Sequence, residues 1–324
     1  MKRILTGDRP TGPLHIAHYF ASIQNRVRLQ DEGNDVMVLI PDYQVIIDRD
    51  TPDHLAEYVT GAVLDYLACG IDPARSTIFA HSAVPALNQL LLPFLSLVSV
   101  PELNRNPTVK DEIQHSRQAT VSGLMFTYPV HQAADILSVK GDLVPVGSDQ
   151  LPHLEITRVI ARRFNERYGP VFPVPEAMLS EAPLLLGTDG GKMSKSRGNS
   201  ITLSGTADET ARLIRGAKTD AERVITYDPD TRPEVSNLVL IAALCLEKDP
   251  HDIAAQVGGG GAAGLKALLI DAVNDRFAPI RARRAELAAD PGLAHSVLRQ
   301  GEERASEIAT RTLEEVRNAM GTRY

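Results

Sequence analysis

Short apolar runs of strand length alternate with helix-length segments through the first half of this chain. Three runs cover residues 3–7, 35–42 and 76–80, a fourth lies with its turn in 142–150, and the helical segments cover about 14–31, 52–70, 86–104 and 151–167. Continuous apolar runs of this length are typical of strands buried on both faces. Their alternation with helices predicts an α/β fold: a doubly wound, parallel, Rossmann-like sheet that binds ligands at its carboxyl edge.

The second part of the chain has a different pattern. Residues 206–324 lack strand-like runs and are rich in Ala, Glu, Arg and Leu. Helical segments are predicted near 206–217, 235–247, 263–288 and 292–320, with the four glycines at 258–261 as a flexible connector. We therefore expect two domains, 1–190 and 191–324, the second of them α-helical, with its last helices packing back toward the first.

Composition sets wide limits. The chain has 324 residues, a formal net charge of −7, 43% hydrophobic and 23% charged residues, as in an ordinary soluble globular protein. It shows no apolar run of membrane-spanning length and no signal peptide, so we expect a protein without a membrane segment. Two distant cysteines, Cys69 and Cys245, argue against a disulfide scaffold and fit a reducing cytoplasm.

Two histidines lie at the start of the first predicted helix. His15 and His18 are three residues apart and share a helix face just after the turn from Gly7 to Gly12. Such a helix N-terminus attracts anions, so both side chains could donate hydrogen bonds to phosphate oxygens. Two ordinary surface histidines are the alternative. A metal pair is disfavoured, because helical zinc ligands usually lie four apart and no third ligand is nearby.

A second group of polar residues lies on one face of an otherwise apolar helix. Tyr128, Gln132 and Asp135 stand at positions i, i+4 and i+7. Buried polar groups need partners, and the small residues Ala133 and Ala134 leave room for a ligand. The pattern predicts the wall of a pocket for an apolar molecule with polar handles; polar residues satisfied inside a core are the alternative.

The glycine-flanked loop at residues 190–199 carries two lysines, two serines and a methionine. This composition suits a mobile basic arm that closes on phosphates. A plain surface loop is the alternative. A Walker-type phosphate loop is excluded, because Gly187 and Gly191 enclose only three residues and Met193 follows Lys192.

Residues 192–196 match the KMSKS signature of class I aminoacyl-tRNA synthetases, and residues 11–18 (TGPLHIAH) resemble the HIGH signature of the same class. The segments 133–137 (AADIL) and 147–150 (GSDQ) resemble the Trp/Tyr subgroup, and the C-terminal helices favour Trp. The chain is thus similar to the bacterial tryptophanyl-tRNA synthetases over nearly its whole length. The resemblance implies activation of L-tryptophan by ATP, with Mg²⁺, and transfer to tRNA(Trp) by a cytoplasmic homodimer whose helical domain reads the anticodon.

The resemblance also assigns residues. It implies catalytic roles for His15, His18, Lys192 and Lys195. It implies an ATP site formed by Gly7, Arg9, Pro10, Thr11, Gly12, Ala17, His18, Gly147, Ser148, Asp149, Leu184, Lys192, Met193, Ser194, Lys195 and Ser196. It implies a tryptophan site formed by Leu5, Gln44, Tyr128, Gln132, Asp135, Val146 and Gln150, with the indole N–H donated to Asp135.

Some residues depart from the family pattern. Ala17 replaces the glycine of the HIGH signature, Arg9 stands where many members have glutamine, and Gln44 where many have histidine. Gln132 replaces a frequent methionine, which keeps tyrosine as an alternative substrate, while an auxiliary tryptophanyl enzyme would also fit these changes. A non-catalytic paralogue is a further alternative, although such a protein would be expected to lose the histidines and lysines that this chain keeps.

Overall fold

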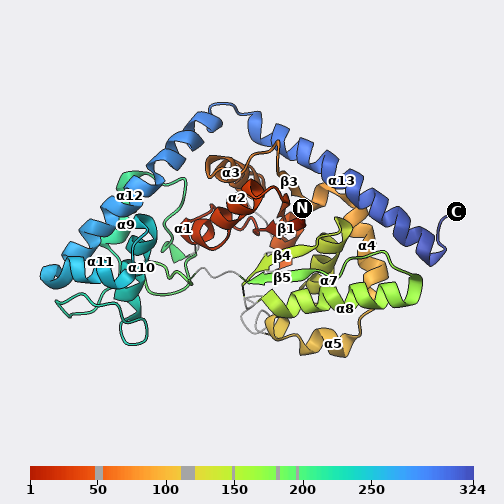
Figure 1. Ribbon diagram of the computed structural model, residues 1–324, viewed down its shortest axis with the longest axis horizontal. Coiled ribbons are helices and arrows are strands. Elements are labelled where there is room, and N and C mark those ends of the chain that lie inside the picture. The colour runs from red at the N-terminus through yellow and green to blue at the C-terminus, as the bar shows by residue number, and fades with distance from the viewer. Residues whose placement is uncertain (48–53, 111–120, 148–149, 180–182, 195–196) are drawn as a thin grey trace.

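The computed structural model describes every residue except 48–53, 111–120, 148–149, 180–182 and 195–196 (Figure 1). At its centre is a five-stranded sheet in the order β3-β2-β1-β4-β5, in which every neighbouring pair is parallel. The strands are β1 (Arg3–Gly7), β2 (Asp35–Ile40), β3 (Thr77–Ala80), β4 (Leu143–Val146) and β5 (Glu176–Leu179). The predicted doubly wound sheet is confirmed, and its order changes direction between β1 and β4, where such sheets bind ligands.

The sheet is buried on both faces, which explains the continuous apolar runs. Ile4, Val36 and Ile78 belong to the core on one face. Leu5 and Met37, their neighbours along β1 and β2, belong to the core on the other face. Alternate residues of one strand thus point into different cores, as the two-residue period of a strand requires. Edge strand β5 lacks this apolar pattern, so the sequence did not predict it.

Helices cover both faces of the sheet. They are α1 (Ile16–His18), η1 (Tyr19–Ile23), α2 (Gln24–Asp31), η2 (Asp42–Ile47), α3 (Leu55–Ala68), η3 (His81–Ala83), α4 (Pro85–Leu95), α5 (Val100–Arg105), α7 (Gly123–Ser138) and α8 (Leu151–Tyr168). The helix expected at 86–104 is two helices, because Ser99 starts α5 with a capping box completed by Glu102. The helix expected at 14–31 begins at Ile16 and contains a π-helical turn, η1.

The C-terminal part is helical, as predicted. It consists of α9 (Ala207–Arg215), α10 (Pro233–Leu246), α11 (Pro250–Val257), the 3₁₀ turn η6 (Gly258–Gly260), α12 (Gly261–Ala288) and α13 (Leu293–Met320). The prediction of a flexible connector at 258–261 was wrong: three of its glycines form η6, the fourth begins α12, and the Gly258 carbonyl accepts a hydrogen bond from the Ile225 N–H at 2.9 Å.

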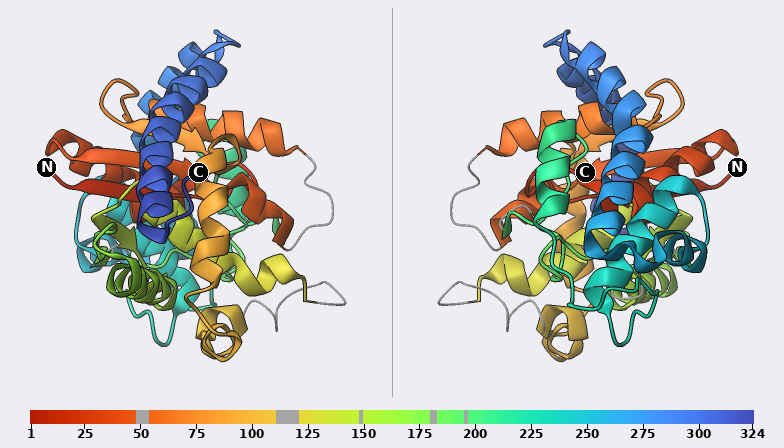
Figure 2. Two further views of the ribbon diagram at one scale, coloured as in Figure 1. Left: turned by 90° about the vertical axis from the view of Figure 1, so that its right-hand side faces the viewer. Right: turned by 90° about the vertical axis from the view of Figure 1, so that its left-hand side faces the viewer.

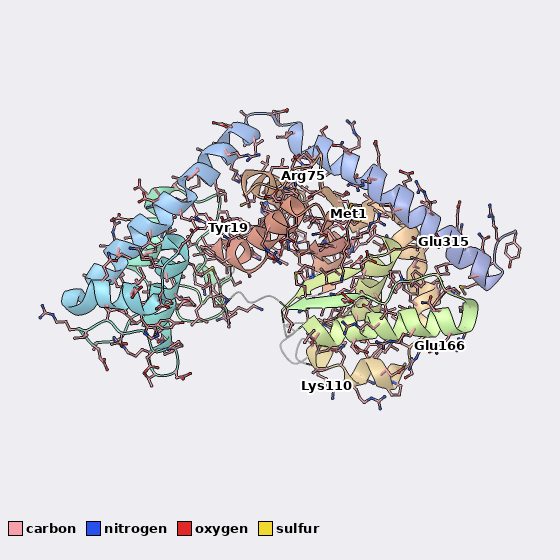
Figure 3. The ribbon with its side chains drawn as sticks, viewed as in Figure 1. Met1, Tyr19, Arg75, Lys110, Glu166 and Glu315 are labelled. Carbon is pink, nitrogen blue, oxygen red and sulfur yellow. The ribbon has the colours of Figure 1, made fainter. Side chains whose placement is uncertain are left out.

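The helical part and the sheet share one continuous core. Tyr19 and Phe20 from η1 meet Phe277 of α12 with ring centroids 5.1 and 6.0 Å apart in edge-on geometry. Tyr19 lies where the two parts meet (Figure 3). Helices α12 and α13 form an arch over the molecule, and α13 returns along the sheet to pack on β3 (Figures 1 and 2).

One stretch of the described chain, Pro250–Ala288, is long and apolar enough to cross a membrane by length and composition, which alone is a weak indication. It comprises α11, η6 and α12. Four apolar residues of α12 at four-residue intervals are buried in the shared core: Leu265, Leu269, Val273 and Phe277. On this face, therefore, the apolar residues of α12 pack inside the protein.

Candidate active site

The carboxyl ends of β1, β2 and β4 carry several of the predicted site residues and lie at one edge of the sheet, because these neighbouring strands are parallel. Gly7 ends β1, and a Cβ there would lie 2.2 Å from the Leu39 carbonyl oxygen. Only glycine allows this approach of β1 to β2. The predicted ATP residues Arg9, Pro10, Thr11 and Gly12 follow in the turn between β1 and α1.

Behind this turn lies a buried ion pair that the sequence did not indicate. Arg26, 1% exposed, donates from Nη1 to Asp8 Oδ2 at 2.6 Å, and the Tyr66 hydroxyl donates to the same oxygen at 2.8 Å. Burial acts to raise the pKa of Asp8, but Arg26, His18 and these hydrogen bonds hold that pKa at about 2. A full negative charge therefore stands beside the histidine pair.

The two histidines of the HIGH-like segment stack at the start of α1, with ring centroids 3.8 Å apart. The His15 backbone N–H donates to His18 Nδ1 at 3.1 Å, so the His18 proton resides on Nε2. Burial and the neighbouring His18 lower the pKa of His15 to about 3, and burial also lowers the pKa of His18. Both rings are thus neutral near pH 7. His15 Nδ1 is buried without a hydrogen-bond partner among the described residues.

The loop with the KMSKS match is fixed to the histidine segment by backbone pairing. The Ile16 N–H donates to the Ile201 carbonyl at 3.0 Å, and the Leu203 N–H donates to the Leu14 carbonyl at 2.9 Å. Lys192 lies close enough to His18 to contribute to lowering the pKa of His18. Segments almost two hundred residues apart therefore form one unit, as the pairing of the two motifs predicted.

Asn199 organises the loop. It is 2% exposed, accepts from the Ser194 N–H at 2.8 Å, and donates to the Lys192 carbonyl at 3.1 Å. Its amide also donates to Asp189 Oδ1 at 2.6 Å. Met193 is 6% exposed and packs into the core, so its side chain anchors the loop. Lys195 and Ser196 lie outside the described residues.

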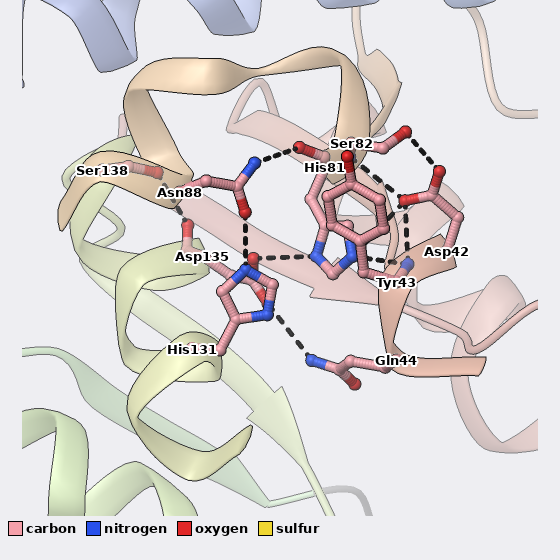
Figure 4. A network of polar contacts seen from close by, with 9 residues as sticks. All are labelled: Asp42, Tyr43, Gln44, His81, Ser82, Asn88, His131, Asp135 and Ser138. Atoms are coloured by element: carbon pink, nitrogen blue, oxygen red, sulfur yellow. Dashed lines mark hydrogen bonds and ion pairs between the residues drawn. The ribbon is translucent and has the colours of Figure 1, made fainter. Parts of the chain in front are cut away.

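Asp135 of α7 is almost fully buried, at 1% exposed, and its two oxygens have different partners (Figure 4). Oδ1 lies 3.1 Å from His81 Nδ1, and Oδ2 accepts from Gln44 Nε2 at 3.4 Å. The structure thus brings together two predicted tryptophan residues, Gln44 and Asp135. His81 was not assigned to the site from the sequence, although it follows β3 at the carboxyl edge, and that position was the available signal.

The hydrogen bonds around His81 define its tautomer. The Tyr43 backbone N–H donates to His81 Nε2 at 2.9 Å, so the ring proton resides on Nδ1 and points to Asp135. Asp42 caps this arrangement: its carboxylate accepts from the Ser82 N–H at 3.1 Å and from the Ser82 hydroxyl. Asp135 therefore accepts a hydrogen bond from a neutral imidazole and keeps its own charge available for a ligand.

The remaining predicted pocket residues belong to four elements, α7, β1, β4 and the start of α8. Gln132 and Tyr128 are on α7 with Asp135, and the Tyr128 hydroxyl lies 2.8 Å from His153 Nε2 of α8. Leu5 of β1 and Val146 of β4 are buried, and Gln150 is the N-cap of α8. The expected helix face is confirmed, and a buried partner, His153, already occupies the Tyr128 hydroxyl.

Three further predicted ATP residues belong to the described part of the chain. Ala17 is in α1 and Gly147 follows β4, whereas the Leu184 side chain is 78% exposed. Ser148 and Asp149 lie outside the described residues. The assignment of these residues to ATP stays a prediction.

The structure joins a histidine-bearing turn to a lysine loop by backbone hydrogen bonds, on a parallel Rossmann-like sheet. This arrangement is the one expected of a class I aminoacyl-tRNA synthetase. A family profile described as tRNA synthetases class I (W and Y) matches residues 1–278. The chain belongs to this family.

Relatives of known function extend the match to the whole chain. The tryptophan–tRNA ligase of Treponema pallidum is 41% identical over 99% of this chain and 97% of its own length. That of Streptococcus pyogenes serotype M1 is 42% identical over 99% of this chain and 98% of its own. The crystal structure of tryptophanyl-tRNA synthetase from Campylobacter jejuni complexed with ADP and tryptophan is similar with a TM-score of 0.85 at 31% identity, covering 98% and 99% of the two chains. The predicted family and enzyme class are confirmed.

Proposed function

We propose that this chain is a tryptophan–tRNA ligase, which joins L-tryptophan to ATP as tryptophanyl-adenylate and then transfers it to tRNA(Trp). The observation that supports this most directly is the buried Asp135 carboxylate, held by His81 and Gln44 at the carboxyl edge of the sheet. The relatives with 41% and 42% identity bear this name. Tyrosine, the alternative substrate, has less support, because these relatives are named tryptophan–tRNA ligases.

ATP would bind over the turn that follows β1. His15 Nδ1, buried without a partner among the described residues, and His18 Nε2–H are available to phosphate or ribose groups. Lys192 would grip the pyrophosphate portion together with Lys195, and the backbone of Met193 and Ser194 would assist. The tryptophan carboxylate attacks the α-phosphate, and pyrophosphate leaves. Because the protein supplies positioning and charge rather than a covalent intermediate, the lysine loop would stabilise the charge that develops on the phosphates.

Mg²⁺ would neutralise phosphate charge in this step. The nearby carboxylate of Asp8 is engaged by Arg26 and Tyr66, so it is not free to serve as a dedicated ligand. We therefore infer that Mg²⁺ enters with the phosphates of ATP.

Tryptophan would be selected by its indole N–H. Leu5 and Val146, both buried, would line the pocket with apolar surface, and the buried Asp135 would provide the acceptor. An amino acid without that N–H would leave the carboxylate charge unpaired, which is a strong basis for rejection. Tyr128, Gln132, Gln44 and Gln150 would complete the pocket and orient the α-amino group.

The second step and the assembly follow the family. A ribose hydroxyl at the 3′ end of tRNA attacks the carbonyl of the adenylate. We propose that 1–190 is the catalytic domain, that 191–324 reads the anticodon, and that the enzyme is a homodimer in the cytoplasm, not in a membrane.

The test is ATP–pyrophosphate exchange with each standard amino acid offered singly. Exchange with tryptophan alone is the expected result, and exchange with tyrosine alone would overturn the assignment. Lys192→Ala should slow exchange by about 10²–10³-fold, as loss of a transition-state contact does. Lys248→Ala, at an exposed position outside the site, is the matched control.

A further inference from the structure

Three buried side chains with metal-binding atoms meet in the proposed amino acid pocket. His81, His131 and Asp135 each offer one ligand atom, and these atoms lie within 4.8 Å of one another. They come from η3 and from α7, and all three are under 5% exposed. Figure 4 shows the imidazoles of His81 and His131 close to the Asp135 carboxylate, and their ring centroids are 4.7 Å apart.

His131 presents a lone pair that no described residue uses. The Asn88 side-chain amide donates to the His81 carbonyl at 3.4 Å, so Asn88 Oδ1 is an acceptor and lies 2.9 Å from His131 Nε2. The His131 proton therefore resides on Nε2. Nδ1 is deprotonated and buried, with no hydrogen-bond partner among the described residues. A neutral imidazole whose other nitrogen is hydrogen-bonded to an amide oxygen is the form in which histidine binds metals.

The ring proton of His81 can reside on either Nδ1 or Nε2, because each nitrogen faces a carboxylate. In the described state its Nδ1–H points to Asp135. Its Nε2 lies 3.3 Å from Asp42 Oδ1, and the same Asp42 oxygen already accepts from the Tyr43 N–H at 3.1 Å. With the proton on Nε2 instead, the Tyr43 N–H would lose Nε2 as an acceptor and keep Asp42 Oδ1. His81 would then donate to Asp42 and present Nδ1 as a ligand beside Asp135. A carboxylate behind a ligating histidine is a common feature of zinc sites.

We propose that His81, His131 and Asp135 form a binding site for a divalent transition metal of the zinc class, and that this metal and tryptophan exclude each other. Two imidazoles and a carboxylate are a ligand set that suits Zn²⁺ with a fourth position open to water. Ligand atoms of tetrahedral zinc are about 3.3 Å apart for bonds of about 2.0 Å. The 3.1 Å between His81 Nδ1 and Asp135 Oδ1 is already close to that spacing.

The exclusion follows from the shared carboxylate and rests on the proposed function. A metal on Asp135 neutralises the charge that the indole N–H would need, and it occupies the space beside His81. Metal binding would therefore hold the enzyme inactive until tryptophan displaces the metal. The metal site itself depends only on the three side chains, whatever the substrate.

The test uses the full chain, freed of metal with a chelator and titrated with Co²⁺. Tetrahedral Co²⁺ absorbs visible light strongly, so binding is seen directly and without any activity measurement. We expect one Co²⁺ per chain, displaced by Zn²⁺, and no such absorption in His131→Asn or in His81→Gln. His295→Asn, at an exposed histidine of α13, should bind Co²⁺ as the parent does. Circular dichroism melting of each variant separates loss of ligand from loss of fold.

Two results would overturn the proposal: absence of stoichiometric Co²⁺ binding to the parent chain, or unchanged binding in folded His131→Asn and His81→Gln. Exclusion is tested by adding tryptophan to the Co²⁺ form, which should abolish the absorption, and by Zn²⁺ inhibition of exchange that excess tryptophan reverses. Simultaneous binding of both would refute the exclusion. If exchange with tryptophan is absent altogether, the proposed function fails, while the Co²⁺ titration still decides the metal site.

Discussion

Asp135 has two carboxylate oxygens, and each accepts a hydrogen bond from a neighbouring side chain. His81 Nδ1–H points to Oδ1, and the Gln44 amide donates to Oδ2 over a longer 3.4 Å. The weaker of these contacts leaves Oδ2 with capacity for an additional donor. We infer that this oxygen receives the indole N–H, while His81 fixes the orientation of the carboxylate.

Replacing Asp135 by asparagine should therefore impair tryptophan recognition. The new amide would direct an N–H₂ group toward either His81 or Gln44, both of which donate in the described state, and it would remove the charge. A hydrogen bond to a charged group contributes about 1.5–3 kcal/mol, so kcat/KM for tryptophan in exchange should fall about 10- to 150-fold. Asp271→Asn, at an exposed position of α12, is the control. An unchanged kcat/KM for tryptophan in folded Asp135→Asn would refute the role of Asp135.

Arg26 should stabilise the fold through its ion pair with Asp8. Arg26→Met would leave the Asp8 charge buried without its guanidinium, and such losses destabilise by about 3–5 kcal/mol. Arg28→Met on the same helix α2 removes an exposed ion pair with Glu32 and exposed hydrogen bonds to Asn25, and it should change stability by less than about 1 kcal/mol. Urea unfolding compares the two. Adding Asp8→Asn to Arg26→Met should recover part of the loss, and equal effects of the two arginine variants would contradict this account.

At the scale of elements, helices and central strands were predictable because each carries its own periodicity. Strands β1 to β4 and most helices occur within a few residues of their predicted bounds. Strand β5 and helix α11 were missed, because β5 is a short edge strand with a weak apolar pattern and α11 is a short helix of eight residues. The site was predictable where chemistry is concentrated in one motif. Arg26 and His81 act through partners distant in sequence, which no local pattern reveals, and Asn199 acts through partners within its own loop that no motif marks.

The lysine loop is an element that depends on one such residue. Asn199→Ala removes the acceptor of the Ser194 N–H and the donor to the Lys192 carbonyl. These hydrogen bonds contribute about 1–3 kcal/mol. If their loss displaces the loop from its catalytic position, kcat/KM for ATP should fall about 5- to 150-fold. The KM for tryptophan should change little, because Asp135 lies on a different element. Asn318→Ala, at an exposed position of α13, is the control, and an equal loss for both substrates would instead indicate a general loss of fold.

The contact between α3 and α12 should make stability depend on pH. Burial raises the pKa of Asp65 to about 6, although its partner Arg284 of α12 acts to lower it. Because the folded protein holds this proton more tightly than an unfolded chain with the ordinary value of 3.8, the proton stabilises the fold. That contribution is fully present below the unfolded pKa and is lost as pH rises through about 6.

Urea unfolding midpoints measured between about pH 4 and about pH 7 should reveal the contribution of the Asp65 proton to stability. Asp65→Asn cannot titrate, so its midpoint should fall less over that interval than the midpoint of the parent. Asp208→Asn, at an exposed residue of the first turn of α9, should keep the parental slope. Identical slopes for the parent and Asp65→Asn would show that this carboxyl group does not titrate in the interval.

At the scale of the whole molecule, α13 closes the arch that begins with α12 and fixes the C-terminal part to the edge of the sheet. Its contact with β3 depends on Gly301, where a Cβ would lie 1.9 Å from the Ile78 carbonyl oxygen. Arg304, one turn further along α13, adds an ion pair to Asp35 at the start of β2 at 2.8 Å. Strand β3 leads directly into His81, so a displacement of this strand would reach the proposed amino acid pocket.

Gly301→Ala tests that connection, because alanine is intrinsically better than glycine within a helix by about 1 kcal/mol. A clash with the β3 backbone should nevertheless make the variant less stable, by about 1–3 kcal/mol in urea unfolding. Gly264→Ala in α12, whose Cβ would meet its nearest atom at an ordinary 3.6 Å, should be neutral or stabilising. Since the displaced strand carries His81, Gly301→Ala should raise the KM for tryptophan more than the KM for ATP. A Gly301→Ala protein as stable as Gly264→Ala would mean that α13 does not pack on β3 in solution, and the arch would lose its role in supporting the pocket.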